Sequence, residues 1–173
     1  LVSVTGDTAT GKIIAANAYK LSDDPTETAG MPTPLKPVPF FNLAPLENAI
    51  ARLKVSAKGY DTTLAAKGAA LTPDVKARLV ALAGKTEQAM TTEPGLPGGR
   101  GWYRNMIYAP GRFTGYGAKT LPGVREAIED ERWEDADTYA GYTAKAINAY
   151  ADLLDQGVTL MGGPAAATST GAR

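Results

Sequence analysis

Side chains typical of a buried helix face recur at helical spacing along three stretches of the chain. From Pro45, spacings alternate between four and three residues and place them on one stripe: Leu46, Ile50, Leu53, Ala57, Tyr60 and Leu64. Thr72 followed by Pro73 is typical of a helix start, and a second stripe follows at Val75, Leu79, Leu82, Thr86 and Met90. The Gly68–Leu71 connection is short enough for an antiparallel helical hairpin.

The third stretch lies toward the C-terminus. Leu121-Pro122-Gly123 predicts the start of a short helix, and a long helix follows with the stripe Ala136, Ala140, Thr143, Ile147, Tyr150 and Leu154. Gly157 is expected to end that helix. Amphipathic helices cannot bury their stripes alone, so we expect an all-α, four-helix-bundle-like domain over residues 44–156. Leu53, Leu79 and Ile147 should be buried between its helices.

Two flanking segments look different. Residues 1–43 predict a short helix followed by an extended Pro-rich strap, because five prolines between residues 25 and 39 forbid a helix. Phe40 and Phe41 at the end of the strap are expected to be core anchors. Residues 157–173 have no apolar period after Gly162 and are interpreted as a flexible tail.

Composition narrows the possible functions. The chain has 173 residues, of which 44% are hydrophobic, which suits one domain with a real core. Eighteen basic residues balance eighteen acidic ones, so the excess positive charge of a nucleic-acid-binding protein is missing. Without Cys or His, the chain has neither thiol catalysis nor the usual zinc ligands. We expect no catalytic residue, no metal site and no membrane segment, and a chain that starts at Leu1 suggests part of something longer.

Charge is distributed unevenly. Residues 44–92 and 93–122 are each net +3, whereas residues 123–156 are net −6. Complementary surfaces within the chain or across a partner interface are one interpretation, and ordinary solvated faces are the other.

Two motifs suggest chemistry but fit a structural role better. Gly6 to Lys12 has the spacing of a phosphate-binding loop, but Ile13 stands where magnesium needs a hydroxyl, which favours a simple turn. The second motif is a run of acidic residues between positions 126 and 137, whose spacing differs from that of a calcium-binding loop. We expect them to favour the first turn of the long helix or to face water. This acidic group comprises Glu126, Glu129, Asp130, Glu131, Glu134, Asp135 and Asp137.

Residues 94–123 are the most informative stretch. They are too rich in Gly and Pro for a helix, yet five of the chain's thirteen aromatic residues lie between Trp102 and Tyr116. Disordered loops are poor in aromatic residues, so this one should be ordered and packed. Aromatic residues with Arg are also typical of interface centres, although packing on the chain's own helices would explain them too.

Four motifs in this loop stand together: Gly95-Leu96-Pro97, the run from Trp102 to Pro110 (WYRNMIYAP), Tyr116, and Leu121-Pro122-Gly123. They resemble the G-L-P…F-Y-R-x-x-I-Y-A-P…Y…F-P-G run of the transferrin receptor-like dimerisation domain, the C-terminal helical part of glutamate carboxypeptidase II and its relatives. The predicted helices also fall where that family has them. The first forty residues match only weakly.

The resemblance implies a non-catalytic domain that packs on its own peptidase domain, which holds two zinc ions, and that contributes to a homodimer. It also implies a loop that contacts a peptide substrate, in which Tyr116 holds a substrate carboxylate. The family's Lys at the preceding position is Gly115 here, and Arg112 or Lys119 could take its place. The loop residues expected at the interface are Trp102, Tyr103, Arg104, Tyr108 and Phe113. A free-standing helical binding module without peptidase association is the alternative.

Overall fold

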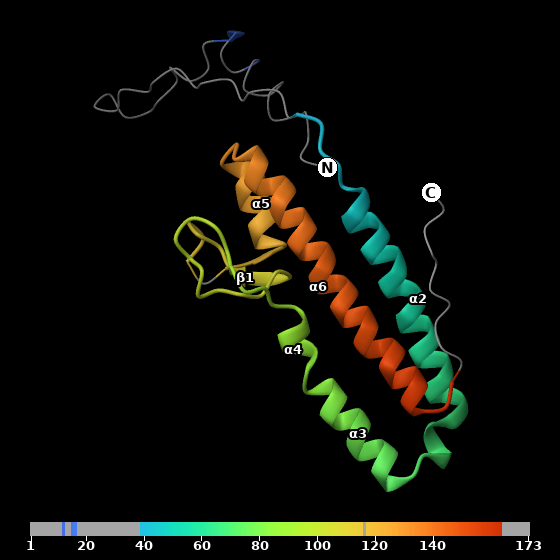
Figure 1. Ribbon diagram of the computed structural model, residues 1–173. Coiled ribbons are helices and arrows are strands. Elements are labelled where there is room, and N and C mark those ends of the chain that lie inside the picture. Colours follow the sequence, from blue (N-terminus) through green and yellow to red (C-terminus); the bar gives the residue numbers. More distant parts are fainter. Residues whose placement is uncertain (1–11, 13–14, 17–38, 116, 164–173) are drawn as a thin grey trace. The chain divides into compact units, whose positions relative to one another are not determined.

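The computed structural model describes residues 12, 15–16, 39–115 and 117–163. The chain divides into two units, Leu1–Phe40 and Phe41–Arg173. The second unit contains all the named elements, which Figure 1 shows. They are α2 (Ala44–Lys67), the 3-10 turn η2 (Gly68–Ala70), α3 (Pro73–Ala83), α4 (Thr86–Ala89), β1 (Tyr108–Pro110), β2 (Ala118–Thr120), α5 (Pro122–Glu129) and α6 (Trp133–Leu160).

The described part is mostly helical, as predicted, but it is not all-α. β1 and β2 form a small antiparallel hairpin inside the loop, with Ala109 opposite Lys119. The predicted phosphate-loop-like motif, short helix and Pro-rich strap lie mostly outside the described residues. Among the described helices, none is long and apolar enough to cross a bilayer.

α6 is the central element. It contacts α2, α3, α4 and α5, and Figure 1 shows it between α2 and α3. α2 and α6 run in the same direction, since Arg52 near the middle of α2 contacts Asn148, Asp152 and Asp155, and Lys67 at its end reaches the carbonyl of Gly162. α3 returns in the opposite direction, as the predicted hairpin requires, and packs on α6.

The buried stripe of α2 is rotated from the predicted one. Ile50 and Leu64 are 37% and 41% exposed, and the buried positions are Leu46, Ala49, Ser56 and Thr63. Small residues face small residues here, because the contacting side of α6 is rich in alanine and helices approach more closely over short side chains. The hydroxyl of Thr63 is satisfied inside the helix, where it donates to the carbonyl of Gly59 at 2.8 Å.

The second predicted helix is shorter than expected. Thr72 caps α3 by accepting a hydrogen bond from the amide of Val75 at 3.4 Å, but the helix ends at Ala83 and only one further turn, α4, follows. α3 has no fully buried residue, so the prediction that Leu79 is buried is wrong. Leu53 is also only half-buried, whereas Ile147 is buried as expected.

The C-terminal helices begin as predicted but end later. Pro122 opens α5, and Leu121 before it has a positive φ of 49°. α6 continues past Gly157 to Leu160, so the prediction that Gly157 ends this helix is wrong. At the start of the unit, the ring of Phe41 lies 5.6 Å from that of Trp133. Phe40 is 93% exposed, which contradicts its predicted role as a core anchor.

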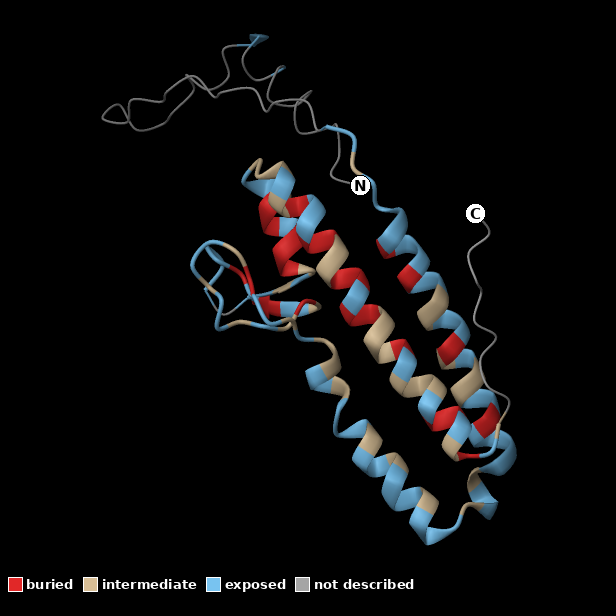
Figure 2. Cartoon of the chain, viewed as in Figure 1, coloured by how far each residue is buried: buried red, intermediate tan, exposed pale blue. Residues whose placement is uncertain are grey.

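Two clusters form the core (Figure 2). One joins α2 to α6 through Leu46, Ala49, Ala144 and Ile147. The other packs the loop before α5 onto α5 and α6. Its buried members are Leu96, Met106, Ala109, Val124, Tyr139, Ala140 and Ala146. The second cluster holds the segment before α5, which is the candidate site, against α5 and α6.

Candidate functional site

The candidate site is the segment of residues 91–121, here called the loop. Although it is rich in glycine and proline, its backbone is closely bonded: the Leu96 amide donates to the Tyr103 carbonyl at 2.8 Å and the Met106 amide to Met90 at 2.9 Å. Leu96 and Met106 are almost fully buried. Packing beneath the loop therefore fixes its path, in agreement with the expectation of an ordered segment.

A glycine and a tyrosine join the loop to α6. Gly95 has a φ of 64°, and a Cβ there would lie 2.1 Å from the carbonyl oxygen of Gly101, so a side chain does not fit. The carbonyl of Gly95 accepts a 2.8 Å hydrogen bond from the buried hydroxyl of Tyr139. Burial raises the pKa of Tyr139 still further above neutrality, so the hydroxyl remains a donor even at mildly alkaline pH. The glycine of the G-L-P motif is thus required by its positive φ and by the close approach of Gly101.

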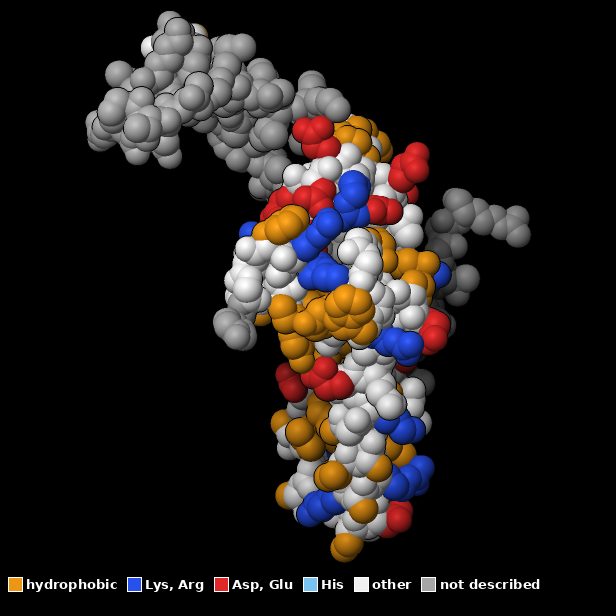
Figure 3. Space-filling view, turned by 90° about the vertical axis from the view of Figure 1, so that its left-hand side faces the viewer, with side chains coloured by type: hydrophobic (Ala, Val, Ile, Leu, Met, Phe, Trp, Pro, Cys, Tyr) orange, Lys and Arg blue, Asp and Glu red, His pale blue; other side chains and the backbone are white. Residues whose placement is uncertain are grey.

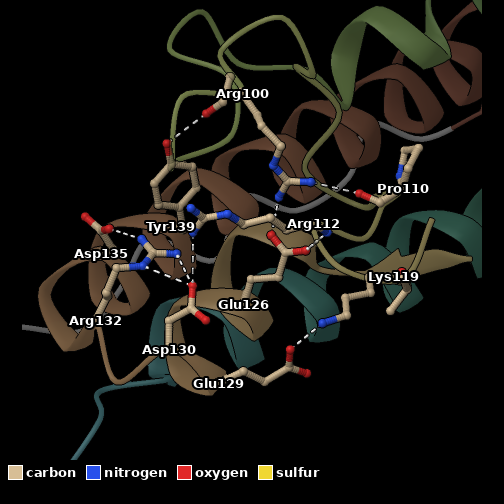
Figure 4. Close-up of polar contacts among 12 residues, drawn as sticks. Arg100, Pro110, Arg112, Lys119, Glu126, Glu129, Asp130, Arg132, Asp135 and Tyr139 are labelled. Atoms are coloured by element: carbon tan, nitrogen blue, oxygen red, sulfur yellow. Dashed lines mark hydrogen bonds and ion pairs between the residues drawn. The ribbon is translucent and has the colours of Figure 1, made fainter.

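Glu126 of α5 joins three parts of the loop (Figure 4). Its carboxylate pairs with the Arg100 guanidinium and accepts the backbone amide of Arg112 at 2.6 Å. Arg100 in turn donates to the carbonyl of Pro110 at 2.9 Å. The two charged side chains are only 11% and 4% exposed. One buried carboxylate therefore holds the loop before β1, the end of β1 and the segment after it.

Two more carboxylates near the end of α5 hold basic residues of the loop. Glu129 pairs with Lys119 of β2 and accepts from Arg125 at 3.1 Å. Asp130 lies 3.5 Å from the Arg112 guanidinium and also contacts Arg132. The complementary charge blocks of the sequence therefore meet within the chain, which confirms that interpretation for these residues.

Burial of Glu126 corrects one expectation from the sequence. The acidic group was expected to serve the long helix or to face water, but Glu126 is 3% exposed. The local pattern around it, P-G-V-R-E, does not reveal this, because its partner is 26 residues away. The signal that could have found it is the charge imbalance, +3 in residues 93–122 and −6 in residues 123–156.

The residues predicted to bind substrate have different surroundings. Tyr116 lies outside the described residues. The side chain of Lys119 is only 14% exposed and is directed at Glu129 (Figure 4). The side chain of Arg112 is 41% exposed and lies over the Phe113 ring at 5.1 Å. Among the described residues, both predicted cations thus have an acidic partner from the chain itself.

The predicted interface residues are mostly exposed. Trp102 is 70%, Phe113 78% and Tyr108 47% exposed, whereas Tyr103 packs against the core cluster. Arg104 lies 3.4 Å from Glu93 at the surface. Figure 3 shows hydrophobic side chains gathered on the face that carries the loop. An anchored loop with large exposed aromatic side chains is suited to contact another surface.

Tyr108 has a local partner of its own. Its hydroxyl lies 3.2 Å from both carboxylate oxygens of Glu87 in α4, and this hydrogen bond raises the pKa of Tyr108. The contact links the start of β1 to the helical segment before the loop.

No metal centre is found in the part of the chain that is described. There, no three His, Cys, Asp or Glu residues are arranged to hold a metal ion. The carboxylates of Glu126 and Glu129 in α5, and of Asp130 after it, are each paired with basic groups instead. These residues do not fit a zinc centre.

Comparison with known proteins agrees with this architecture. The sequence model of the transferrin receptor-like dimerisation domain matches residues 41–155. The chain is 32% identical over 100 residues to "Probable glutamate carboxypeptidase LAMP1" of Arabidopsis thaliana, covering 54% of this chain and 14% of that protein. It is 37% identical over 67 residues to "Probable glutamate carboxypeptidase" of Arthroderma benhamiae, covering 39% of this chain and 9% of that protein. The chain thus spans only a small fraction of the length of these relatives, and it belongs to the transferrin receptor-like dimerisation domain family.

Proposed function

We propose that this chain is the non-catalytic helical domain of a glutamate carboxypeptidase-like zinc metallopeptidase. In the assembled protein it contributes homodimer contacts and packs its loop against the adjacent peptidase domain, at the substrate pocket. Its bundle-like helices serve as the scaffold for that loop. The family assignment supports the proposal, as does the much greater length of the two relatives.

The observation that carries the proposal is the construction of the loop. Its backbone is fixed to α5 and α6 by Glu126 and Tyr139, yet Trp102 and Phe113 are left exposed. Exposing two large aromatic side chains on a rigid support is unfavourable unless another surface covers them. A neighbouring peptidase domain or a second copy of the protein would supply that surface.

The peptidase domain would carry out the hydrolysis of the peptide bond. Two zinc ions there would polarise the scissile carbonyl and activate water. This chain would hold and orient the peptide, because Tyr116 would donate its hydroxyl to a substrate carboxylate.

The test uses the full-length protein that carries this chain. Tyr116→Phe removes one hydrogen bond to a charged group, so kcat/KM should fall about ten- to a hundredfold with little change in stability. The 173-residue chain alone should hydrolyse no dipeptide, with or without zinc. Unchanged efficiency for the variant would remove the substrate contact, and chelator-sensitive hydrolysis by the isolated chain would contradict the non-catalytic assignment.

A further inference from the structure

One face of α2 and α6 is exposed and belongs to neither core cluster. Arg52 of α2 reaches Asn148 and Asp152 of α6, so the two helices present this face together (Figure 1). We call it the outer face. Its main residues lie at helical spacing, and none of them is buried. They are Val55 and Lys58 of α2, and Asp137, Gly141, Lys145 and Asp152 of α6.

The outer face is directed away from the loop. Tyr139 and Ala146 of α6 join the core cluster that holds the loop. At about 3.6 residues per turn, Asp137, Gly141 and Lys145 lie on the other side of the helix from these two residues. A contact made by the outer face therefore does not compete with a contact made by the loop.

Two charged residues of the outer face have no ion-pair partner in the described part of the chain. They are Asp137 near the start of α6 and Lys58 in α2. Lys145, which lies between them, is 5.8 Å from the Tyr142 ring but contacts no carboxylate of a described residue. The helix dipole does not account for Asp137 or Lys58, because its effect is confined to the first and last turns and both residues lie outside them.

These two charges are too far apart to pair within one chain. α2 and α6 run in the same direction, and Arg52 contacts Asp152. Asp137 precedes Asp152 by fifteen residues, whereas Lys58 follows Arg52 by six. At a rise of about 1.5 Å per residue, Asp137 and Lys58 are therefore about 30 Å apart along the helix pair. Within one chain neither can neutralise the other, but two copies can bring them together.

We infer that the outer face binds the same face of a second copy, with the helices of the two copies antiparallel, which rests on the proposed homodimer and specifies its contact surface. A two-fold axis then brings Asp137 of each copy to Lys58 of the other. Both charges gain a partner of opposite sign, and each pair forms twice. A parallel arrangement would instead place like charges opposite each other.

The same arrangement suits the middle of the outer face. The two-fold axis passes between Lys145 and Asp152, so these residues of opposite charge meet across it. Val55, which is 69% exposed, lies opposite Gly141 of the second copy, and no atom of its own chain lies within 4 Å of the Gly141 Cβ position. An exposed apolar side chain is thus covered without a clash and is flanked by charge pairs, as in specific interfaces.

Charge reversal in the full-length protein tests the antiparallel pairing. Lys58→Glu and Asp137→Lys should each raise the dissociation constant of the dimer about tenfold or more, because each variant creates two contacts between like charges. Sedimentation measures this constant. The double variant should return to within about threefold of the unmodified protein, because reversing both partners restores the pairs. Lys76→Glu makes the same charge change at an exposed position in α3 and should have no effect.

Gly141→Gln provides a second arm that changes no charge. The added side chain enters open space on α6, so the chain should fold as before but dimerise more weakly. If the full-length protein dimerises and none of these variants changes its affinity, the inference is wrong and the homodimer uses another surface. A double variant as weak as the single ones would also overturn it. A full-length protein that stays monomeric would overturn both the inference and the proposed homodimer.

Discussion

The ring of Tyr60 in α2 packs directly on the backbone of Gly157 in α6. A Cβ at residue 157 would lie 2.5 Å from Cε2 of Tyr60, closer than carbon atoms can approach. The sequence suggested that Gly157 ends α6, but the helix continues past it to Leu160. The absence of a side chain at Gly157 instead makes room for an aromatic ring between two parallel helices. The contact lies in the C-terminal halves of α2 and α6.

The first prediction concerns this contact. Gly157→Ala should destabilise the chain by about 1 to 3 kcal/mol, because the added methyl group must displace the Tyr60 ring. Urea denaturation measures the change. Gly141→Ala in the same helix is the matched control: nothing lies within 4 Å of its Cβ position, so the better helix propensity of alanine should make it neutral or stabilising. Equal effects of the two variants would show that the ring does not occupy this position.

The second prediction concerns the buried pair of Glu126 and Arg100. Glu126→Ala leaves a guanidinium that is 11% exposed without its counter-ion, so stability should fall by about 3 to 5 kcal/mol. Hydrogen exchange supplies a local measurement, since the Arg112 amide donates to Glu126 and should lose protection when that acceptor is removed. Glu134→Ala, at an exposed position in the first turn of α6, is the matched control. Unaltered protection of the Arg112 amide would mean that Glu126 does not hold the loop.

The third prediction is the pH dependence of the Glu129 contact. Its pKa in the folded chain is below the ordinary value of 4.5, mainly because of Lys119 and then Arg125. A lowered folded-state pKa means that the contribution to stability is present above the ordinary pKa and is lost as pH falls through the folded value. Glu129→Gln should therefore be less stable than the unmodified chain near neutral pH, and the difference should shrink on acidification. A difference that stays constant from pH 7 to about pH 3 would contradict this.

How far the sequence predicted the fold depended on the size of the side chains involved. α6 is long and strongly periodic, and the first four residues of its predicted stripe are buried, whereas Tyr150 and Leu154 are only half-buried. In α2, the pattern of large apolar residues pointed to Ile50 and Leu64, but Ala49 and Ser56 face the partner helix. Small residues carry little hydrophobic signal, yet they allow close helix packing, so the rotation could not be predicted from hydrophobicity.

In the candidate site, the sequence carried the local signals but not the long-range contacts. The motifs of the loop predicted that it is ordered, because glycine, proline and aromatic residues at fixed spacing report local backbone requirements. The pairing of Glu126 with Arg100 joins segments that only the folded chain brings together. Sequence could show that opposite charges were separated into blocks, but not which carboxylate would be buried.

The last prediction concerns the exposed aromatic side chains of the loop. Trp102 is 70% exposed, so Trp102→Ala should change the stability of the isolated chain by no more than about 0.5 kcal/mol. If Trp102 is an anchor at the proposed homodimer interface, its truncation in the full-length protein should weaken the dimer by about 2 kcal/mol or more. Sedimentation of the full-length Trp102→Ala variant would then show weaker dimerisation. If kcat/KM falls while the dimer affinity is unchanged, Trp102 contacts the peptidase domain instead. Val80→Ala in α3, at a residue 74% exposed and outside the loop, is the control. If Trp102→Ala and Val80→Ala are equally silent in both assays, Trp102 contacts neither a second copy nor the peptidase domain.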